Sequence, residues 1–139
     1  MKQGPIILIE DDEDDALLFK EALEDLRVPN LLRHFKVCPD AWEYLITTRE
    51  KPFIIFCDIN LPLQNGLDFK AQLDENLYLR QKSIPFVFYT TTSNQNDINH
   101  AYQAMVVQGF FIKPSEFQRV KQTLSAIMQY WAICKHPNS

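Results

Sequence analysis

The stretch IILIEDDEDD, residues 6–15, decides how the rest of the chain is interpreted. Four apolar residues run directly into six consecutive acids, Glu10 to Asp15, out of eighteen carboxylates in the whole chain. A short, β-branched run that is apolar on both faces is typical of a strand inside a parallel sheet. The stretch therefore predicts a buried strand that ends in a concentrated negative charge, and the partners of that charge must come from elsewhere in the chain.

Apolar runs alternate with amphipathic segments along the remaining sequence. Further strands are expected near residues 31–35, 53–57, 85–90 and 109–114. Helices are expected at residues 14–26, 40–47, 66–76, 94–106 and 117–134, with a polar connection through Ser83. Strict alternation of strands and helices favours a parallel sheet covered by helices on both faces. The sequence thus predicts a single α/β domain over residues 1–139.

The composition narrows the class of protein. A hydrophobic fraction of 46% and a charged fraction of 23% are ordinary for a globular domain, and the net charge of −4 argues against bulk nucleic-acid binding. No stretch approaches the roughly 18 apolar residues of a membrane span, and the first residues do not resemble a signal peptide. The three cysteines lack the spacing of a zinc site or a disulfide framework. We therefore expect a cytoplasmic protein without a membrane partner.

The residues that end the predicted strands should meet at one edge of the sheet. They are the first acids of the opening stretch, then Asp58, Thr90 and Lys113. Two carboxylates about 4 Å apart repel by roughly 4 kcal/mol at an effective dielectric constant near 20, so the cluster needs a proton, a lysine or a metal ion. One lysine neutralises only one acid. A divalent cation explains the cluster better, and Mg²⁺ suits a small set of oxygen ligands.

Each of these residues also has an ordinary structural interpretation. The acids 13–15 are more simply explained as the start of a helix, where the helix dipole favours negative charge. Asp58 could cap a loop, Thr90 could be a plain β-branched strand residue, and Lys113 could be one half of an ion pair. Their joint occurrence at the ends of four strands of one sheet favours a functional site.

Four motifs in order carry a family resemblance: IEDD (9–12), DINLPLQNG (58–66), FYTTTS (88–93) and GFFIKP (109–114). The chain resembles the receiver domains of two-component response regulators, of the single-domain, CheY-like type, over nearly its whole length. The resemblance implies a flavodoxin-like fold, which is a doubly wound five-stranded parallel sheet with strand order 2-1-3-4-5. It also implies a phosphoaccepting signalling protein in a phosphorelay and not an enzyme.

The resemblance assigns a metal and phosphoacceptor site. Glu10 and Asp11 match the acidic pair that binds Mg²⁺, for which Mn²⁺ could substitute. Asp58 matches the phosphoacceptor, which also binds the metal, and Asn60 would add its backbone carbonyl. Asp12 falls one position beyond the acidic pair and is expected to be peripheral.

The resemblance also assigns a conformational switch. Thr90 matches the switch hydroxyl and Lys113 the phosphate-binding lysine, and a cis peptide bond is expected before Pro114. Phe110 stands where the family often has tyrosine, so it could swing inward but could not offer a hydroxyl group. Alternatively, Phe110 is packed inside permanently. The surface expected to respond is that of the fourth helix, fifth strand and fifth helix, about residues 94–133.

Partners and phosphate lifetime follow from the same resemblance. Asn60, Thr91 and Thr92 would tune how long the phosphoryl group survives. The expected partners are a sensor histidine kinase or a phosphotransfer protein, and a downstream protein or relay, with a possible homodimer through residues 94–133. The polar runs near 74–83 and 90–98 resemble receivers that serve phytochrome-like kinases. Few residues follow the last predicted helix, so no output domain is expected.

Two other functions compete with this interpretation. A haloacid dehalogenase-type phosphatase also uses an aspartate nucleophile and Mg²⁺, but it needs a second aspartate where this chain has Asn60. A phosphorylation-independent interaction module could use the same scaffold. Such modules usually lack an acid, the phosphoacceptor or the lysine, and this sequence has all of them.

Overall fold

The computed structural model describes residues 4–91 and 94–137. The strands are β1 (Ile6–Ile9), β2 (Leu32–Phe35), β3 (Ile54–Cys57), β4 (Phe86–Thr90) and β5 (Gly109–Ile112). The helices are α1 (Glu13–Asp25), α2 (Cys38–Thr47), α3 (Gly66–Glu75), α4 (Leu77–Lys82), α5 (Gln95–Ala104) and α6 (Phe117–Ile133). No helix in the described ranges is both long and apolar enough to cross a bilayer.

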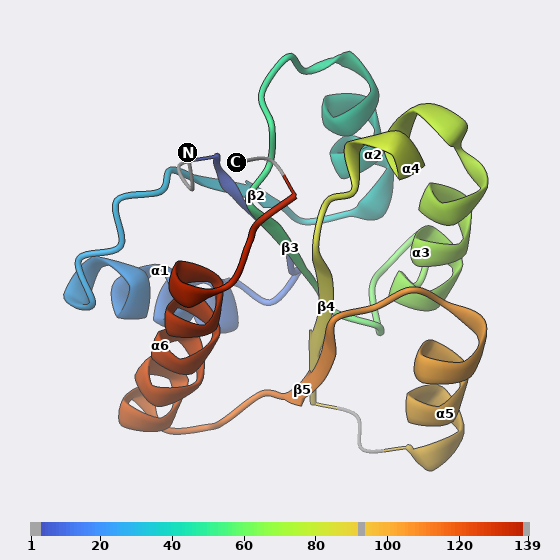
Figure 1. Ribbon diagram of the computed structural model, residues 1–139. Coiled ribbons are helices and arrows are strands. Elements are labelled where there is room, and N and C mark those ends of the chain that lie inside the picture. Colours follow the sequence, from blue (N-terminus) through green and yellow to red (C-terminus); the bar gives the residue numbers. More distant parts are fainter. Residues whose placement is uncertain (1–3, 92–93, 138–139) are drawn as a thin grey trace.

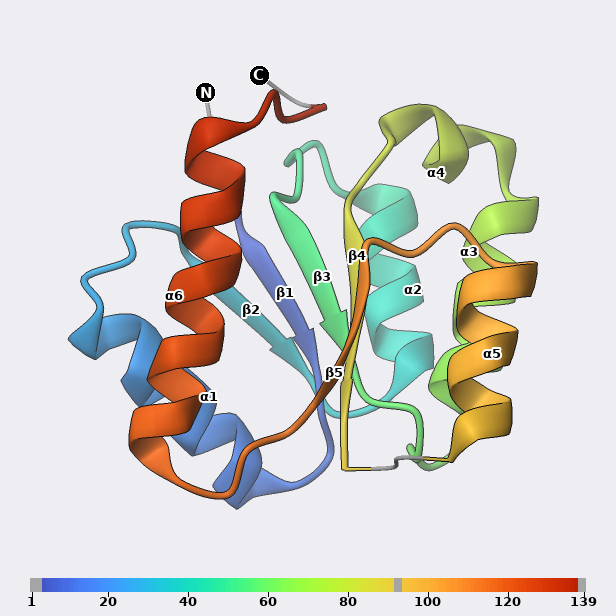
Figure 2. The same cartoon turned by 60° about the horizontal axis from the view of Figure 1, so that its bottom comes forward.

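All strands are parallel and lie in the order β2-β1-β3-β4-β5, which confirms the predicted sheet. Helices α1 and α6 cover one face, and α2, α3 and α5 cover the other (Figures 1 and 2). Parallel strands need crossover connections, and these connections place the helices over both faces of the sheet. The carboxyl ends of the strands therefore open at one edge, away from both chain termini (Figure 2).

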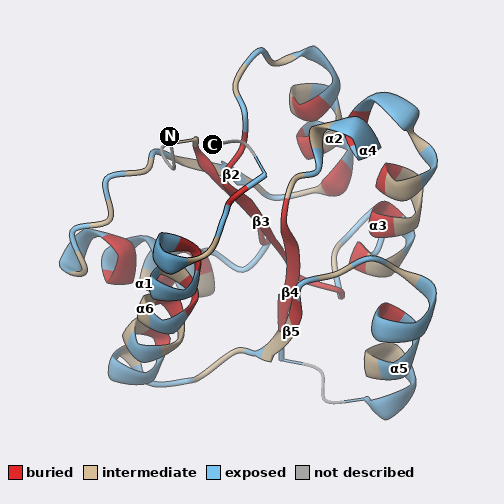
Figure 3. Ribbon diagram, viewed as in Figure 1, coloured by how far each residue is buried: buried red, intermediate tan, exposed pale blue. Residues whose placement is uncertain are grey.

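The central strands are buried on both sides, as Figure 3 shows. Every residue of β1, β3 and β4 is buried. On the α1 and α6 face, the rings of Phe19 and Phe56 meet edge-to-face with centroids 4.9 Å apart. On the other face, Phe69 and Phe88 belong to a second core. Burial on both faces explains why these strands have continuous apolar runs and not an alternating pattern.

The structure differs from the expected helix pattern between α3 and β4. Residues 77–82 form the short helix α4, where the sequence predicted a polar connection. The side chain of Asn76 caps this helix by accepting a hydrogen bond of 3.0 Å from the Leu79 amide, and Leu79 alone is buried. One buried residue in six leaves no helical periodicity to detect. The expected fourth and fifth helices are therefore α5 and α6.

Candidate functional site

Backbone hydrogen bonds beyond the strand ends bring the predicted residues to one edge of the sheet. The amide of Asp58 donates to the carbonyl of Ile9 at 3.0 Å, which places Asp58 beside Glu10. On the other side, the amide of Lys113 donates to the carbonyl of Thr90 at 2.7 Å. The parallel register thus assembles side chains that are far apart in sequence, as the prediction required.

Lys113 is the centre of a buried ionic cluster. Its Nζ lies 2.5 Å from Glu10 Oε1, 2.8 Å from Asp58 Oδ2 and 2.9 Å from Asp15 Oδ2. The side chains of Lys113, Glu10 and Asp58 are 6%, 2% and 8% exposed, so water screens these contacts little. Asp58 Oδ1 also accepts a 2.7 Å hydrogen bond from the Ile59 amide. Both oxygens of the predicted phosphoacceptor are therefore held in defined positions.

Asp15 belongs to this cluster, although its sequence context predicted only a helix start. Asp12 caps α1 by accepting a 2.9 Å hydrogen bond from the Asp15 amide, so the helix begins at Glu13. Asp15 is then the third helical residue, and its side chain reaches back to Lys113. The signal in the sequence that would have placed Asp15 is the capping residue Asp12. The position of the cap determines which direction around the helix each of the following acids faces.

The electrostatics of the cluster favour a bound cation. Burial, opposed by the hydrogen bond from Lys113 and reinforced by the charge of Asp58, raises the pKa of Glu10 to about 7. Burial lowers the pKa of Lys113, but its hydrogen bonds to Asp15, Asp58 and Glu10 outweigh this effect and raise that pKa overall. The ammonium group is therefore charged, and Glu10 can hold a proton near neutral pH. The raised pKa of Glu10 shows that Lys113 alone does not neutralise the carboxylates of the cluster, so a bound cation would be favourable.

Three of the acids fit a metal ion. Carboxylate oxygens of Glu10, Asp11 and Asp58 all lie within 4.8 Å of one another. Glu10 and Asp58 are buried whereas Asp11 is exposed, so the group has a side open to solvent. Mg²⁺ keeps several waters and needs only one or two carboxylates, which suits a site of this kind. Asn60, whose backbone carbonyl was expected to join them, is exposed two residues after Asp58.

The loop after β3 is shaped by a close backbone approach at Gly66. A Cβ atom at this position would lie 2.1 Å from the carbonyl oxygen of Asp58, so only glycine fits there. The Gly66 amide donates to the Ile59 carbonyl at 2.8 Å, and Asn65 caps α3. This loop folds back on the strand end and holds the backbone of Asp58 in place.

The predicted switch residues lie on the two strands next to the cluster. Thr90 is fully buried at the end of β4. Phe110 is partly buried, and its ring packs against Phe88 with centroids 5.8 Å apart. Thr91 is exposed beyond Thr90, and Thr92 lies outside the described residues.

The expected cis peptide bond before Pro114 is wrong for this structure. No peptide bond within residues 4–91 and 94–137 is cis. For a bond before proline the trans form is favoured by about 0.5–1 kcal/mol. With the trans form Lys113 already reaches three carboxylates, so the contacts of the cluster do not require the cis form.

Comparisons with known proteins agree with the geometry. The probable methanogenesis regulatory protein FilR2 of Methanothrix harundinacea is 30% identical over 130 residues, which cover 91% of this chain and 82% of that protein. The structure of the phosphorylated cyanobacterial phytochrome response regulator RcpA superposes with a TM-score of 0.84 at 26% identity, covering 97% of this chain and 99% of that chain. The Mn²⁺-bound form of response regulator Rcp1 gives a TM-score of 0.81 at 25% identity, covering 96% and 99%.

The match to a family model identifies the family of the chain. The model of the response regulator receiver domain matches residues 6–125, a span that runs from the start of β1 into α6. It contains every strand and all the predicted site residues. Because this match covers most of the chain, the chain belongs to the family of response regulator receiver domains.

Proposed function

We propose that this receiver domain accepts a phosphoryl group on Asp58 from the phosphohistidine of a sensor histidine kinase or a phosphotransfer protein, with Mg²⁺ bound by Glu10, Asp11 and Asp58. The observation that carries the proposal is the position of Asp58. Its carboxylate is buried between the Lys113 ammonium and the acidic pair, at the edge where parallel sheets place their sites. The likeness to a phytochrome response regulator supports a phytochrome-like kinase as the donor.

The chemistry needs positioning and charge neutralisation more than covalent assistance. A carboxylate oxygen of Asp58 forms the new O–P bond while the N–P bond of the phosphohistidine breaks, and the imidazole leaves as the neutral group after taking up a proton. Lys113 holds Asp58 through a 2.8 Å contact and can neutralise a phosphoryl oxygen. The bound Mg²⁺ would supply positive charge for the phosphoryl oxygens. The product adds roughly one further negative charge beside Lys113.

The test is intact-mass measurement after incubation with acetyl phosphate. With Mg²⁺ or Mn²⁺, the mass should rise by about 80 Da, which corresponds to one phosphoryl group. Asp58→Asn should abolish the adduct, whereas Asp74→Asn, which alters a different carboxylate, should retain it. Because an acyl phosphate can hydrolyse quickly, a beryllofluoride titration followed by NMR is the second arm. A chain that gains no adduct and is unchanged by beryllofluoride would contradict the proposal and favour a phosphorylation-independent interaction module.

The signal would leave the site through Thr90 and Phe110. Thr90 would donate its hydroxyl to a phosphoryl oxygen, and the space that it vacates would admit the ring of Phe110, which now packs against Phe88. The surface of α5, β5 and α6 would change as a result. This surface would bind the downstream protein or relay, or a second copy of the chain.

Thr90→Val separates the switch from phosphorylation because it keeps the shape of the side chain and removes the hydroxyl. We expect the variant to form the adduct while the beryllofluoride-induced amide shifts across residues 94–133 fall at least severalfold. Thr91→Val is the matched control, since Thr91 is exposed. Undiminished shifts in Thr90→Val would show that the signal takes another route.

A further inference from the structure

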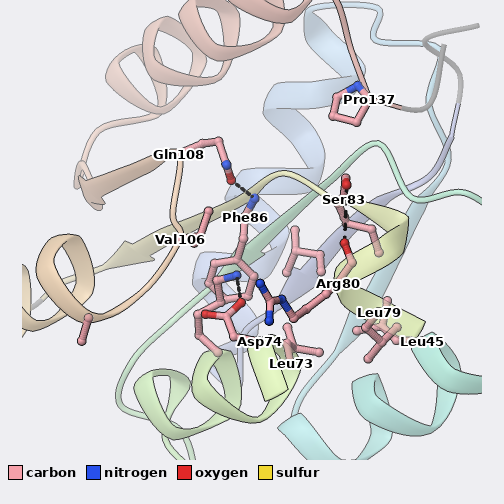
Figure 4. Close-up of a pocket in the computed structure, with 14 residues that line it drawn as sticks. Leu45, Leu73, Asp74, Leu79, Arg80, Ser83, Phe86, Val106, Gln108 and Pro137 are labelled. Atoms are coloured by element: carbon pink, nitrogen blue, oxygen red, sulfur yellow. Dashed lines mark hydrogen bonds and ion pairs between the residues drawn. The ribbon is translucent and has the colours of Figure 1, made fainter. Parts of the chain in front are cut away.

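A cavity lies at the other end of the sheet from Asp58. Its volume is about 510 Å³, and its walls come from α3, α4, β4 and the segment before β5 (Figure 4). Phe86, the first residue of β4, and Gln108, just before β5, both line it. The amino ends of these strands therefore open into this cavity, whereas the phosphoacceptor site lies beyond the carboxyl ends. The two sites share no residue.

The helix α4, which the sequence did not predict, builds one wall of this cavity. Leu79, Arg80 and Ser83 contribute to the lining. Ser83 ends the helix in a left-handed conformation with φ 52°, and the chain then turns into β4. The cavity thus depends on the extra turn of chain between α3 and β4.

The floor of the cavity is apolar. Leu45, Ile55, Leu73, Leu79 and Phe86 line it, and all of them are buried parts of the core on this face. Small-molecule sites typically have volumes of about 300–1,000 Å³, with apolar walls and a few polar groups that orient the ligand. The size and lining of this cavity match such a site.

The polar groups of the cavity carry a surplus of positive charge. Lys70, only 7% exposed, donates to Asp74 Oδ1 at 2.6 Å and lies 5.1 Å from the centroid of the Phe86 ring. Asp74 is therefore already matched by one cation. The guanidinium of Arg80 makes no ion pair with any described residue, and Figure 4 shows it turned into the pocket. Two cations face one carboxylate.

We propose that this cavity binds a small organic acid with an apolar body, whose carboxylate pairs with Arg80. The planar guanidinium offers two parallel donors that match the two oxygens of a carboxylate. The apolar body would cover Leu73, Leu79 and Phe86. Binding at this place goes beyond the phosphoacceptor function and does not depend on it.

The test uses octanoate as the probe and amide NMR of the full chain as the measurement. Octanoate should shift the amides of residues 70–86 and 104–108 in a saturable way. Arg80→Gln should weaken binding roughly tenfold, because a charge-assisted hydrogen bond is removed. Arg119→Gln is the matched control, an exposed arginine on α6. Octylammonium has the same chain with the opposite charge and should not bind, and Asp58→Asn should bind octanoate as the natural chain does.

Several outcomes would overturn this proposal. One is the absence of saturable shifts at these residues with octanoate. Another is equal binding of octylammonium, which would show that charge is not recognised. A third is an Arg80→Gln variant that binds as tightly as the Arg119→Gln control. Octanoate binding to Asp58→Asn is measured without phosphorylation. A failure of octanoate to bind would therefore not contradict the proposal that Asp58 accepts a phosphoryl group.

Discussion

Two buried lysines at opposite ends of the sheet show how surroundings set the role of one residue type. Lys113 and Lys70 have side chains that are 6% and 8% exposed. Lys113 contacts three carboxylates, with Asp11 close by, so its surroundings lack positive charge. Among the described residues Lys70 forms an ion pair with Asp74 only, and Arg80 lies in the same cavity, so the surroundings of Lys70 carry an excess of positive charge.

Burial of a lysine thus does not by itself indicate that a ligand binds beside it. The sign of the net charge around the lysine indicates whether a cation or an anion would bind there. At the carboxyl ends of the strands an acidic surplus favours a divalent cation, and at the amino ends a basic surplus favours an anion. Three measurements test the contrast between Lys113 and Lys70.

The largest expected effect is that of Lys113→Met. The substitution removes the ammonium group that Glu10, Asp15 and Asp58 all contact. It should lower the free energy of unfolding by about 3 kcal/mol. This is the low end for breaking a buried ion pair, because burial raises the pKa of Glu10 to about 7 even beside Lys113, so that Glu10 can take up a proton when the ammonium group is lost. Urea unfolding at neutral pH without metal measures the loss. A variant as stable as the natural chain would show that Lys113 does not hold the cluster.

The next effect is stabilisation by Mg²⁺. A ligand at ten times its dissociation constant adds about 1.4 kcal/mol, which corresponds to a rise of roughly 5 °C in Tm for a domain of this size. Thermal unfolding with and without Mg²⁺ measures the rise. Asp11→Asn should remove it, whereas Asp74→Asn should not. A rise that persists in Asp11→Asn would place the ion elsewhere.

The smallest effect is that of Lys70→Met. The new side chain has an apolar stem of similar length beside Phe86, whose ring centroid lies 5.1 Å from the Lys70 Nζ. The side chain of Asp74 is 30% exposed and can regain water. The loss in free energy of unfolding should be about 1 kcal/mol or less. Urea unfolding beside Lys113→Met gives the comparison directly. Equal losses in the two variants would mean that the charge imbalance around Lys113 has no energetic consequence.

The sheet was predictable because its strands have a strong local signal. The runs at 6–9, 54–57 and 86–89 are apolar, and each is followed directly by a polar residue. Once the strands are parallel, their carboxyl ends share an edge, so Glu10, Asp58 and Lys113 were expected together, and they are. The pattern of apolar runs along the sequence was sufficient here, since the order of the strands and the position of a residue at a strand end determine which side chains lie next to one another.

The structure differs from the expectations at three points, each for its own physical reason. Helix α4 has a single buried residue and therefore no apolar periodicity. The place of Asp15 depends on where Asp12 starts the helix, and a change of one residue there would turn Asp15 away from Lys113. The bond before Pro114 was expected to be cis from the family resemblance alone, and the contacts of Lys113 are made with a trans bond.

The apolar runs and the residues that follow them were sufficient to predict the parallel sheet and its order of elements. They also predicted which acids and which lysine meet at its edge. The number of carboxylates that Lys113 contacts and the direction in which Arg80 points depend on how the folded chain packs in three dimensions. Those outcomes depend on helical phase and on the packing of α4 against its neighbours, and no local pattern encodes the distance between two side chains that the chain brings together from far apart.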